Sequence, residues 1–127
     1  MRAICFLLLS VVCFSTLAAT PLISQQALLT SDDNERLILD VRSQQEFAQG
    51  HVPGAINIPH TDLANQIDKL TPYQDKTIVL YCRSGRRAEI AADTLTKLEF
   101  KHLLHLEGDM QGWIANQRAV EKQEIEN

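Results

Sequence analysis

The chain has 127 residues, a formal net charge of −4 and 45% hydrophobic residues, so it can form one ordinary domain and is too apolar to be disordered. Its acidic balance argues against a protein that coats nucleic acid, because such a protein is expected to carry a basic surface. Its three cysteines are an odd number and are too few for a disulfide scaffold.

Residues 1–18 have the pattern of a secretory signal peptide. Arg2 provides a short basic start, an apolar run covers residues 3–14, and small or weakly polar residues follow. The apolar run is shorter than the about 20 residues that a membrane-spanning helix needs. We therefore expect the chain to be exported, with cleavage after Ala18 or Ala19.

Removal of this segment changes the cysteine content of the protein. It takes away Cys5, Cys13 and the positive charge of Arg2, so residues 19–127 carry a net charge of −5 and one cysteine, Cys82. A lone thiol has no internal partner. Cys82 is therefore either a buried packing residue or a reactive group.

Short apolar segments alternate with segments of helical pattern along the rest of the chain. In chain order we expect a helix at 24–29, a strand at 37–39, a helix at 43–49, a strand at 55–58, a helix at 61–70, a strand at 77–81, a helix at 87–98 and a strand at 102–106. Such alternation predicts a single α/β domain over residues 19–127, with a parallel sheet covered by helices on both faces.

Several local signals refine this outline. Ser43 and Glu46 form a capping box at a helix start, and Gly50 is placed to end that helix. The helix at 87–98 is expected to bury the apolar side chains Ile90, Ala91, Leu95 and Leu98.

The end of the chain has weaker signals. Residues 108–112 are flanked by glycines and are expected to form a turn before Trp113. The polar segment 115–127 is expected to be a surface helix or tail that frays at its end.

The sharpest feature of the sequence is the segment that begins at Cys82 and reads Cys-Arg-Ser-Gly-Arg-Arg. It follows the strongest predicted strand and precedes a helix, which is the edge where open α/β sheets place their sites. Backbone N–H groups at such a helix start favour negative charge and stabilise a thiolate. We therefore expect Cys82 to be the reactive group, and an anion to be bound by the residues that follow it: Arg83, Ser84, Gly85, Arg86 and Arg87.

The motifs resemble those of the rhodanese family of sulfurtransferases. Residues 39–47 and 50–59 look like the N-terminal signature of that family, and residues 82–87 look like its six-residue active-site loop. Residues 108–113 are similar to its C-terminal glycine–tryptophan signature, with Asp109 where a second glycine is common. Together with the signal peptide, this pattern is most similar to the small periplasmic rhodaneses, so the resemblance implies a periplasmic location.

The resemblance also implies a fold and a reaction. The fold would be a rhodanese-like three-layer arrangement, with a parallel sheet of about five strands between helices on both faces. Cys82 would take the outer sulfur of thiosulfate or a similar small anionic donor and would pass it from a persulfide to cyanide or a thiol acceptor. The family reaction needs no metal or organic cofactor, and no nucleic acid partner is expected.

The resemblance suggests roles for the surrounding side chains as well. Arg83 and Arg87 are the first candidates to attract the donor, with Arg86 behind them. Asp40 and Arg42 lie at the end of a predicted strand near Cys82. We expect them to support the site, Asp40 by binding loop amides and Arg42 by bracing the site.

Other functions share parts of this pattern. A dual-specificity phosphatase needs arginine at position 88, where this chain has Ala88, and the related arsenate reductases are disfavoured on the same ground. A non-enzymatic persulfide carrier for a partner protein stays open, because the same cysteine would serve it. His102 and His105 lie three residues apart on a predicted strand and so on opposite faces, which argues against a metal site.

Overall fold

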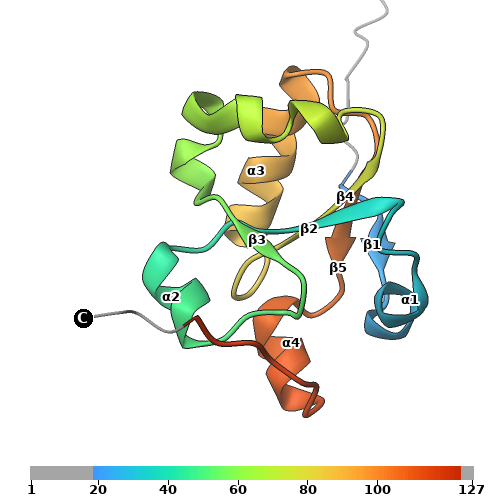
Figure 1. The fold of residues 1–127 in the computed structure, drawn as a ribbon, viewed down its shortest axis with the longest axis vertical. Coiled ribbons are helices and arrows are strands. Elements are labelled where there is room, and N and C mark those ends of the chain that lie inside the picture. The colour runs from blue at the N-terminus through green and yellow to red at the C-terminus, as the bar shows by residue number, and fades with distance from the viewer. Residues whose placement is uncertain (1–18, 124–127) are drawn as a thin grey trace, which may run out of the picture.

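The computed structural model describes residues 19–123, so the predicted signal peptide lies outside the described residues. The described chain forms one sheet of five strands in the order β1-β5-β4-β2-β3, and every pairing is parallel (Figure 1). The strands are β1 (Leu22–Ile23), β2 (Arg36–Asp40), β3 (Ile56–Asn57), β4 (Thr77–Tyr81) and β5 (Leu103–Leu106). The predicted parallel sheet of about five strands is confirmed.

The helices alternate with these strands as the sequence pattern predicts. The α-helices are α1 (Gln25–Thr30), α2 (Gln44–Gln49), α3 (Arg86–Lys97) and α4 (Asp109–Ala115). Three short 3₁₀ helices, η1 (His60–Asp62), η2 (Ala64–Lys69) and η3 (Thr71–Tyr73), connect β3 to β4. The predicted capping box at Ser43 and Glu46 is present, and Gly50 follows α2 as its C-cap. None of the helices within residues 19–123 is long and apolar enough to cross a membrane.

The core has two halves, one on each face of the sheet. Along β4, Ile78 and Leu80 enter one apolar cluster, whereas Val79 and Tyr81 enter the other, because successive side chains of a strand point to opposite faces. The first cluster packs the sheet against α3 and the 3₁₀ segment, and the second packs it against α1 and α4. This is the three-layer α/β arrangement that the sequence predicted.

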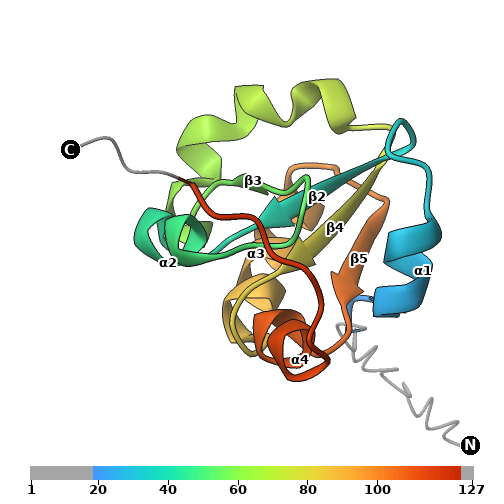
Figure 2. The ribbon, with the colours of Figure 1, turned by 60° about the horizontal axis from the view of Figure 1, so that its bottom comes forward.

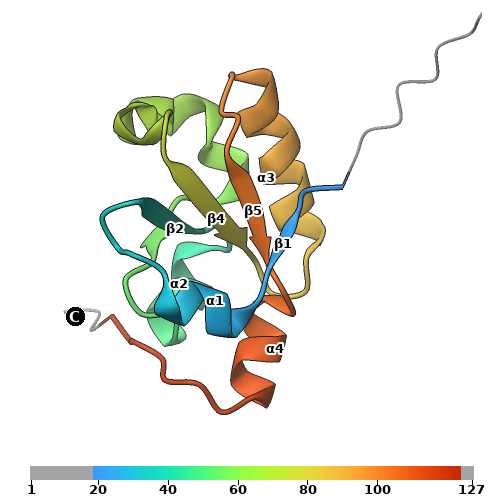
Figure 3. The same ribbon diagram turned by 90° about the vertical axis from the view of Figure 1, so that its right-hand side faces the viewer.

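The parallel strands bring their carboxyl ends to one edge of the sheet. Strands β4 and β5 point toward the end of the molecule where α4 lies (Figure 3). Cys82 follows β4 at this edge, and Asp40 ends the neighbouring strand β2. The edge therefore collects side chains that are far apart in the sequence.

Three local predictions are wrong. The segment 61–70 is a run of 3₁₀ turns with a kink at Gln66 instead of one α-helix. Residues 108–112 are not a free turn, because α4 starts at Asp109 and Gly112 lies inside it. On α3 the expected burial of Ala91 and Leu95 is confirmed, but the buried face is completed by Ala88 and Ala92, whereas the expected Ile90 and Leu98 are 45% and 39% exposed.

The C-terminal segment also differs from the prediction. It continues beyond α4 as an extended stretch that runs back toward α2, where the main chains of His51 and Glu121 exchange two hydrogen bonds (Figure 2). The helix ends because Gln117 has a φ of 55°. Beyond it, the Ala119 carbonyl accepts the indole N–H of Trp113 at 2.8 Å, which holds the following chain against α4. Within residues 116–123, the expected surface helix is therefore absent.

Candidate active site

Cys82 lies in a tight loop between β4 and α3. Its side chain is buried, and its Sγ atom accepts the backbone N–H of Gly85 at 3.0 Å. Gly85 has a φ of 117° and is the N-cap of α3. L-residues avoid this backbone region, so glycine allows the turn that brings its N–H to the sulfur. The predicted meeting of the thiol with a helix start is present in the structure.

Helix α4 fixes this loop from a distant part of the sequence. The Met110 and Gln111 amides donate to the carbonyls of Cys82 and Arg83 at 3.0 and 3.1 Å. In the opposite direction, the Cys82 amide donates to the Asp109 carboxylate at 3.0 Å. Three hydrogen bonds thus join the first turn of α4 to the two residues at the start of the cysteine loop.

Asp109 belongs to a small polar network that the sequence pattern did not reveal. Its Oδ1 atom lies 2.9 Å from Nε2 of His105, and Nδ1 of His105 lies 3.0 Å from Oε1 of Glu89. The contact with Asp109 is the main cause that raises the pKa of His105 above its ordinary value. Asp109 stands where the signature that the sequence resembles commonly has glycine. This departure was the only sign of the polar network in the sequence.

The loop arginines differ in their surroundings. Arg87 makes a bidentate ion pair with Glu46 of α2, with N···O distances of 2.6 and 3.0 Å. This contact lowers the pKa of Glu46 to about 2. By contrast, Arg83 and Arg86 are exposed and form no ion pair with any residue of the described chain. The sequence did not reveal Glu46 as the partner of Arg87, because the two residues lie 41 positions apart in the chain.

Asp40 and Arg42 form a buried pair near this edge. The Arg42 guanidinium makes three short contacts with the Asp40 carboxylate, at 3.0, 3.0 and 2.7 Å, and donates to the Gly50 carbonyl at 2.7 Å. Asp40 also accepts the Arg42 amide, at 2.9 Å. The expectation that Asp40 binds loop amides thus holds for the amide of Arg42, whereas the amides of Cys82 and Gly85 donate to Asp109 and to Cys82 Sγ instead.

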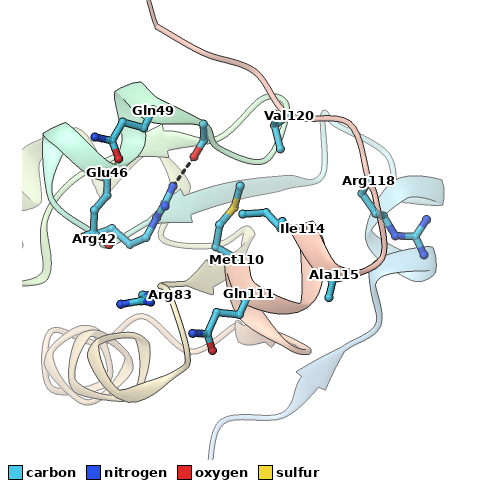
Figure 4. A pocket seen from close by; sticks show the side chains of 11 residues that line it. Arg42, Glu46, Gln49, Arg83, Met110, Gln111, Ile114, Ala115, Arg118 and Val120 are labelled. Atoms are coloured by element: carbon cyan, nitrogen blue, oxygen red, sulfur yellow. Dashed lines mark hydrogen bonds between the residues drawn. The ribbon is translucent and has the colours of Figure 1, made fainter.

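A groove of about 900 Å³ opens beside the loop. Figure 4 shows Arg42, Glu46 and Gln49 on one side, with Arg83 at the loop. The facing wall comes from α4 and the chain that follows it, with Met110, Gln111, Ile114, Ala115, Arg118 and Val120 (Figure 4). The groove thus combines an apolar wall with a cationic end at Arg83, the residue that follows Cys82. Its volume lies in the range of sites for organic ligands.

A metal centre is not part of the described arrangement. Within residues 19–123, no group of three or more His, Cys, Asp or Glu side chains is placed to hold a metal ion. The groups that the structure does bring to the site are a thiol, backbone N–H donors and guanidinium groups. They suit the binding of an anion and nucleophilic attack by sulfur.

Comparisons with known proteins agree with this geometry. The rhodanese-like domain family matches residues 24–116. A Bacillus subtilis protein named "Putative sulfur carrier protein YrkF" is 36% identical over 83 residues, which are 65% of this chain and 44% of that protein. The tRNA uridine(34) hydroxylase of Buchnera aphidicola is 34% identical over 99 residues, 75% of this chain and 31% of that enzyme. The chain therefore spans less than half the length of these curated relatives.

Solved structures show the same fold. A rhodanese-related protein from Thermoplasma volcanium is 28% identical with a TM-score of 0.69, covering 80% of this chain and 97% of that one. A thiosulfate sulfurtransferase from Pseudomonas aeruginosa is 25% identical with a TM-score of 0.73, covering 81% of this chain and 20% of that one. Together with the family match and the strand-end cysteine loop, these likenesses show that the chain belongs to the rhodanese-like family and contains one small rhodanese-like domain.

Proposed function

We propose that this protein is a sulfurtransferase that moves the outer sulfur of thiosulfate, or of a similar donor, through a persulfide on Cys82. The observation that carries the proposal is the Cys82 sulfur, which lies at the start of α3 and accepts the Gly85 N–H at 3.0 Å. A helix start and a backbone donor both favour a negative charge on sulfur. The thiolate and the persulfide anion are the two anionic forms that the reaction requires at this position.

The reaction consists of two nucleophilic displacements at sulfur. In the first, the Cys82 thiolate attacks the outer sulfur of thiosulfate, the S–S bond of the donor breaks, and sulfite leaves with the bonding electron pair. In the second, a thiolate or cyanide attacks the outer sulfur of the persulfide, which restores the Cys82 thiolate. Both steps keep the total charge constant and need no external oxidant. The Gly85 N–H stabilises the charge on sulfur throughout.

Among the loop arginines, Arg83 is the one best placed to attract the donor. Arg87 is already neutralised by Glu46, whereas Arg83 has no acidic partner in the described chain and lines the groove. Arg87 then supports the site by tying α3 to α2. Ser84 and Arg86 are exposed beside it and contribute to the same anionic environment.

The groove favours an organic thiol as the acceptor. Its volume of about 900 Å³ and its apolar side chains Met110, Ile114 and Val120 suit a ligand with a carbon skeleton. A second candidate function is that of a persulfide carrier, in which a thiol of a partner protein enters the groove. The relative named as a sulfur carrier supports this candidate. An enzyme turns over many times with thiosulfate and cyanide, whereas a pure carrier stops after one sulfur.

The decisive experiment is intact-mass analysis with thiosulfate. The protein should gain the mass of one sulfur atom, and Cys82→Ser should gain none and lose thiosulfate:cyanide activity. Unchanged mass in the parent protein, or retained activity in Cys82→Ser, contradicts the proposal. For the donor site, Arg83→Gln should raise the KM for thiosulfate about two- to fivefold and weaken its salt dependence. Lys101→Gln, which removes an exposed charge elsewhere, serves as the matched control.

We also propose that the protein works in the periplasm after removal of its N-terminal segment. The support is the pattern of residues 1–18 alone. Intact mass of the protein recovered from a Gram-negative periplasm should place the new N-terminus at Ala19 or Thr20. Recovery of the full-length chain in the cytoplasm contradicts this proposal.

A further inference from the structure

A buried acid–base pair lies directly behind the cysteine loop. Asp109, at the start of α4, and His105, in β5, are 4% and 8% exposed. One oxygen of Asp109, Oδ1, accepts the Cys82 amide at 3.0 Å and lies 2.9 Å from Nε2 of His105. The main chain of the nucleophile and the imidazole ring therefore share one carboxylate oxygen.

The other side of the ring faces a second carboxylate. Nδ1 of His105 is 3.0 Å from Oε1 of Glu89. The other carboxylate oxygen of Glu89, Oε2, accepts a hydrogen bond from the Thr20 hydroxyl at 3.4 Å. A neutral imidazole donates from only one nitrogen, whereas an imidazolium donates from both. Two carboxylates at hydrogen-bond distance from the two nitrogens therefore favour the protonated ring. The charged groups that face His105 are Glu89 from α3 and Asp109 from α4.

The pair also contacts the far end of the loop. A Cβ atom placed on Gly85 would lie 3.2 Å from Oδ2 of Asp109 and 3.3 Å from Cε1 of His105. The turn that delivers the Gly85 N–H to Cys82 Sγ is thus packed against both side chains. The pair contacts the loop at its first residue through the Cys82 amide and at its last residue through Gly85.

We propose that His105 and Asp109 are positioning residues whose shared proton holds the cysteine loop in its reactive form. While His105 is protonated, it fixes the Asp109 carboxylate under the Cys82 amide and supports the turn at Gly85. When His105 loses its proton, one nitrogen lone pair faces a carboxylate, and the resulting repulsion loosens that support. This inference rests on the proposed sulfurtransferase function for its kinetic readout. Its ligand-independent readout is the reactivity of the Cys82 thiol.

The pair predicts that the reactivity of Cys82 changes with pH in the direction opposite to that caused by ionisation of the thiol itself. Ionisation of a cysteine makes the protein more reactive as pH rises, whereas loss of the His105 proton should make it less reactive. The kcat/KM for thiosulfate should therefore fall again on the alkaline side, above the ordinary histidine range. His105→Gln should remove this alkaline decline and lower kcat/KM at pH 6 about tenfold, with little change at pH 9.

The test compares four proteins over pH 5.5–10: the parent, His105→Gln, Asp109→Asn and the control Glu107→Gln. Glu107 is an exposed neighbour outside the network, so its variant should keep the parent profile. Titration of the His105 ring by NMR should give the same midpoint as the alkaline decline of the parent. A His105→Gln profile identical in shape to that of the parent overturns the inference.

A second set of measurements keeps the outcome independent of folding and of the proposed function. If His105→Gln does not fold, Asp109→Gly decides the question, because glycine accepts the φ of 52° at this position and removes the side chain that carries the carboxylate. The alkylation rate of Cys82, read by peptide mass spectrometry, needs no sulfur donor. If the parent protein has no activity with thiosulfate but its alkylation rate still declines at alkaline pH, only the proposed function is refuted. Absence of the decline from both readouts refutes the role of the pair.

Discussion

Replacement of Gly85 by alanine should damage the cysteine loop more than the fold. The change adds a Cβ at a φ of 117°, where an L-residue is strained by about 1–2 kcal/mol. The new atom would also lie 3.2 Å from Asp109 Oδ2 and 3.3 Å from His105 Cε1, closer than ordinary van der Waals contact. Relief of this crowding must shift the backbone that carries the Gly85 N–H. We expect a total loss of about 2–3 kcal/mol in unfolding free energy, or roughly 10 °C in Tm.

Gly54 provides a matched control for the strain. It also has a positive φ, 81°, but a Cβ added there meets no atom within 4 Å. Gly54→Ala should therefore cost only the strain, about 1 kcal/mol, and leave sulfur transfer unchanged. The entropy lost from the unfolded chain is the same in both variants and cancels in the comparison.

The assay is the rate of persulfide formation on Cys82 with excess thiosulfate, together with thermal unfolding. Gly85→Ala should form the persulfide at least tenfold more slowly than Gly54→Ala, because the N–H that binds Sγ at 3.0 Å is displaced. Equal rates and equal Tm values for the two variants would refute the reasoning. They would show that neither the crowding nor the Gly85 N–H affects the sulfur.

Two further predictions concern stability. Because the pKa of Glu46 is lowered to about 2 from 4.5, its ion pair with Arg87 should stabilise the fold above pH 4.5, and this stabilisation should be lost as the pH falls toward 2. Urea unfolding of Glu46→Gln should therefore show a deficit of about 1 kcal/mol at pH 7 that vanishes near pH 2, and a deficit that persists at pH 2 contradicts the assignment. Leu80→Ala, at a fully buried position of β4, should cost about 2–5 kcal/mol, whereas the control Ile90→Ala, 45% exposed, should cost less than about 0.5 kcal/mol. A loss below 1 kcal/mol for Leu80→Ala would show that this face of the sheet repacks.

The sequence was informative wherever the signal is local. The apolar run before Cys82 predicted β4, and Ser43 with Glu46 predicted the start of α2, because both depend on residues within one turn or strand. Strand–helix alternation predicted the parallel sheet, since a parallel connection needs a crossover. A parallel sheet in turn places the residue after β4 at the carboxyl edge of the sheet, so the position of Cys82 could be predicted from the sequence.

The sequence was less informative where several backbone conformations fit the same residues. The segment 61–70 has apolar residues at helical spacing, yet packing over the sheet gives 3₁₀ turns. The tail after α4 has a composition that suits a helix, but the bonds from Trp113 to Ala119 and from His51 to Glu121 hold it extended. In both cases tertiary contacts outweigh weak local preferences.

The sequence by itself thus determined the α/β class, the parallel sheet with helices on both faces, and the place of Cys82 between a strand and a helix. Only the tertiary structure paired Arg87 with Glu46 and left Arg83 without an acidic partner in the described chain. It also placed His105 and Asp109 under the loop, 23 and 27 residues beyond Cys82 in the chain. The physical reason is that a strand or a cap depends on neighbouring residues. The charge state and the support of an active-site loop depend on which distant side chains the folded sheet edge brings within hydrogen-bond distance.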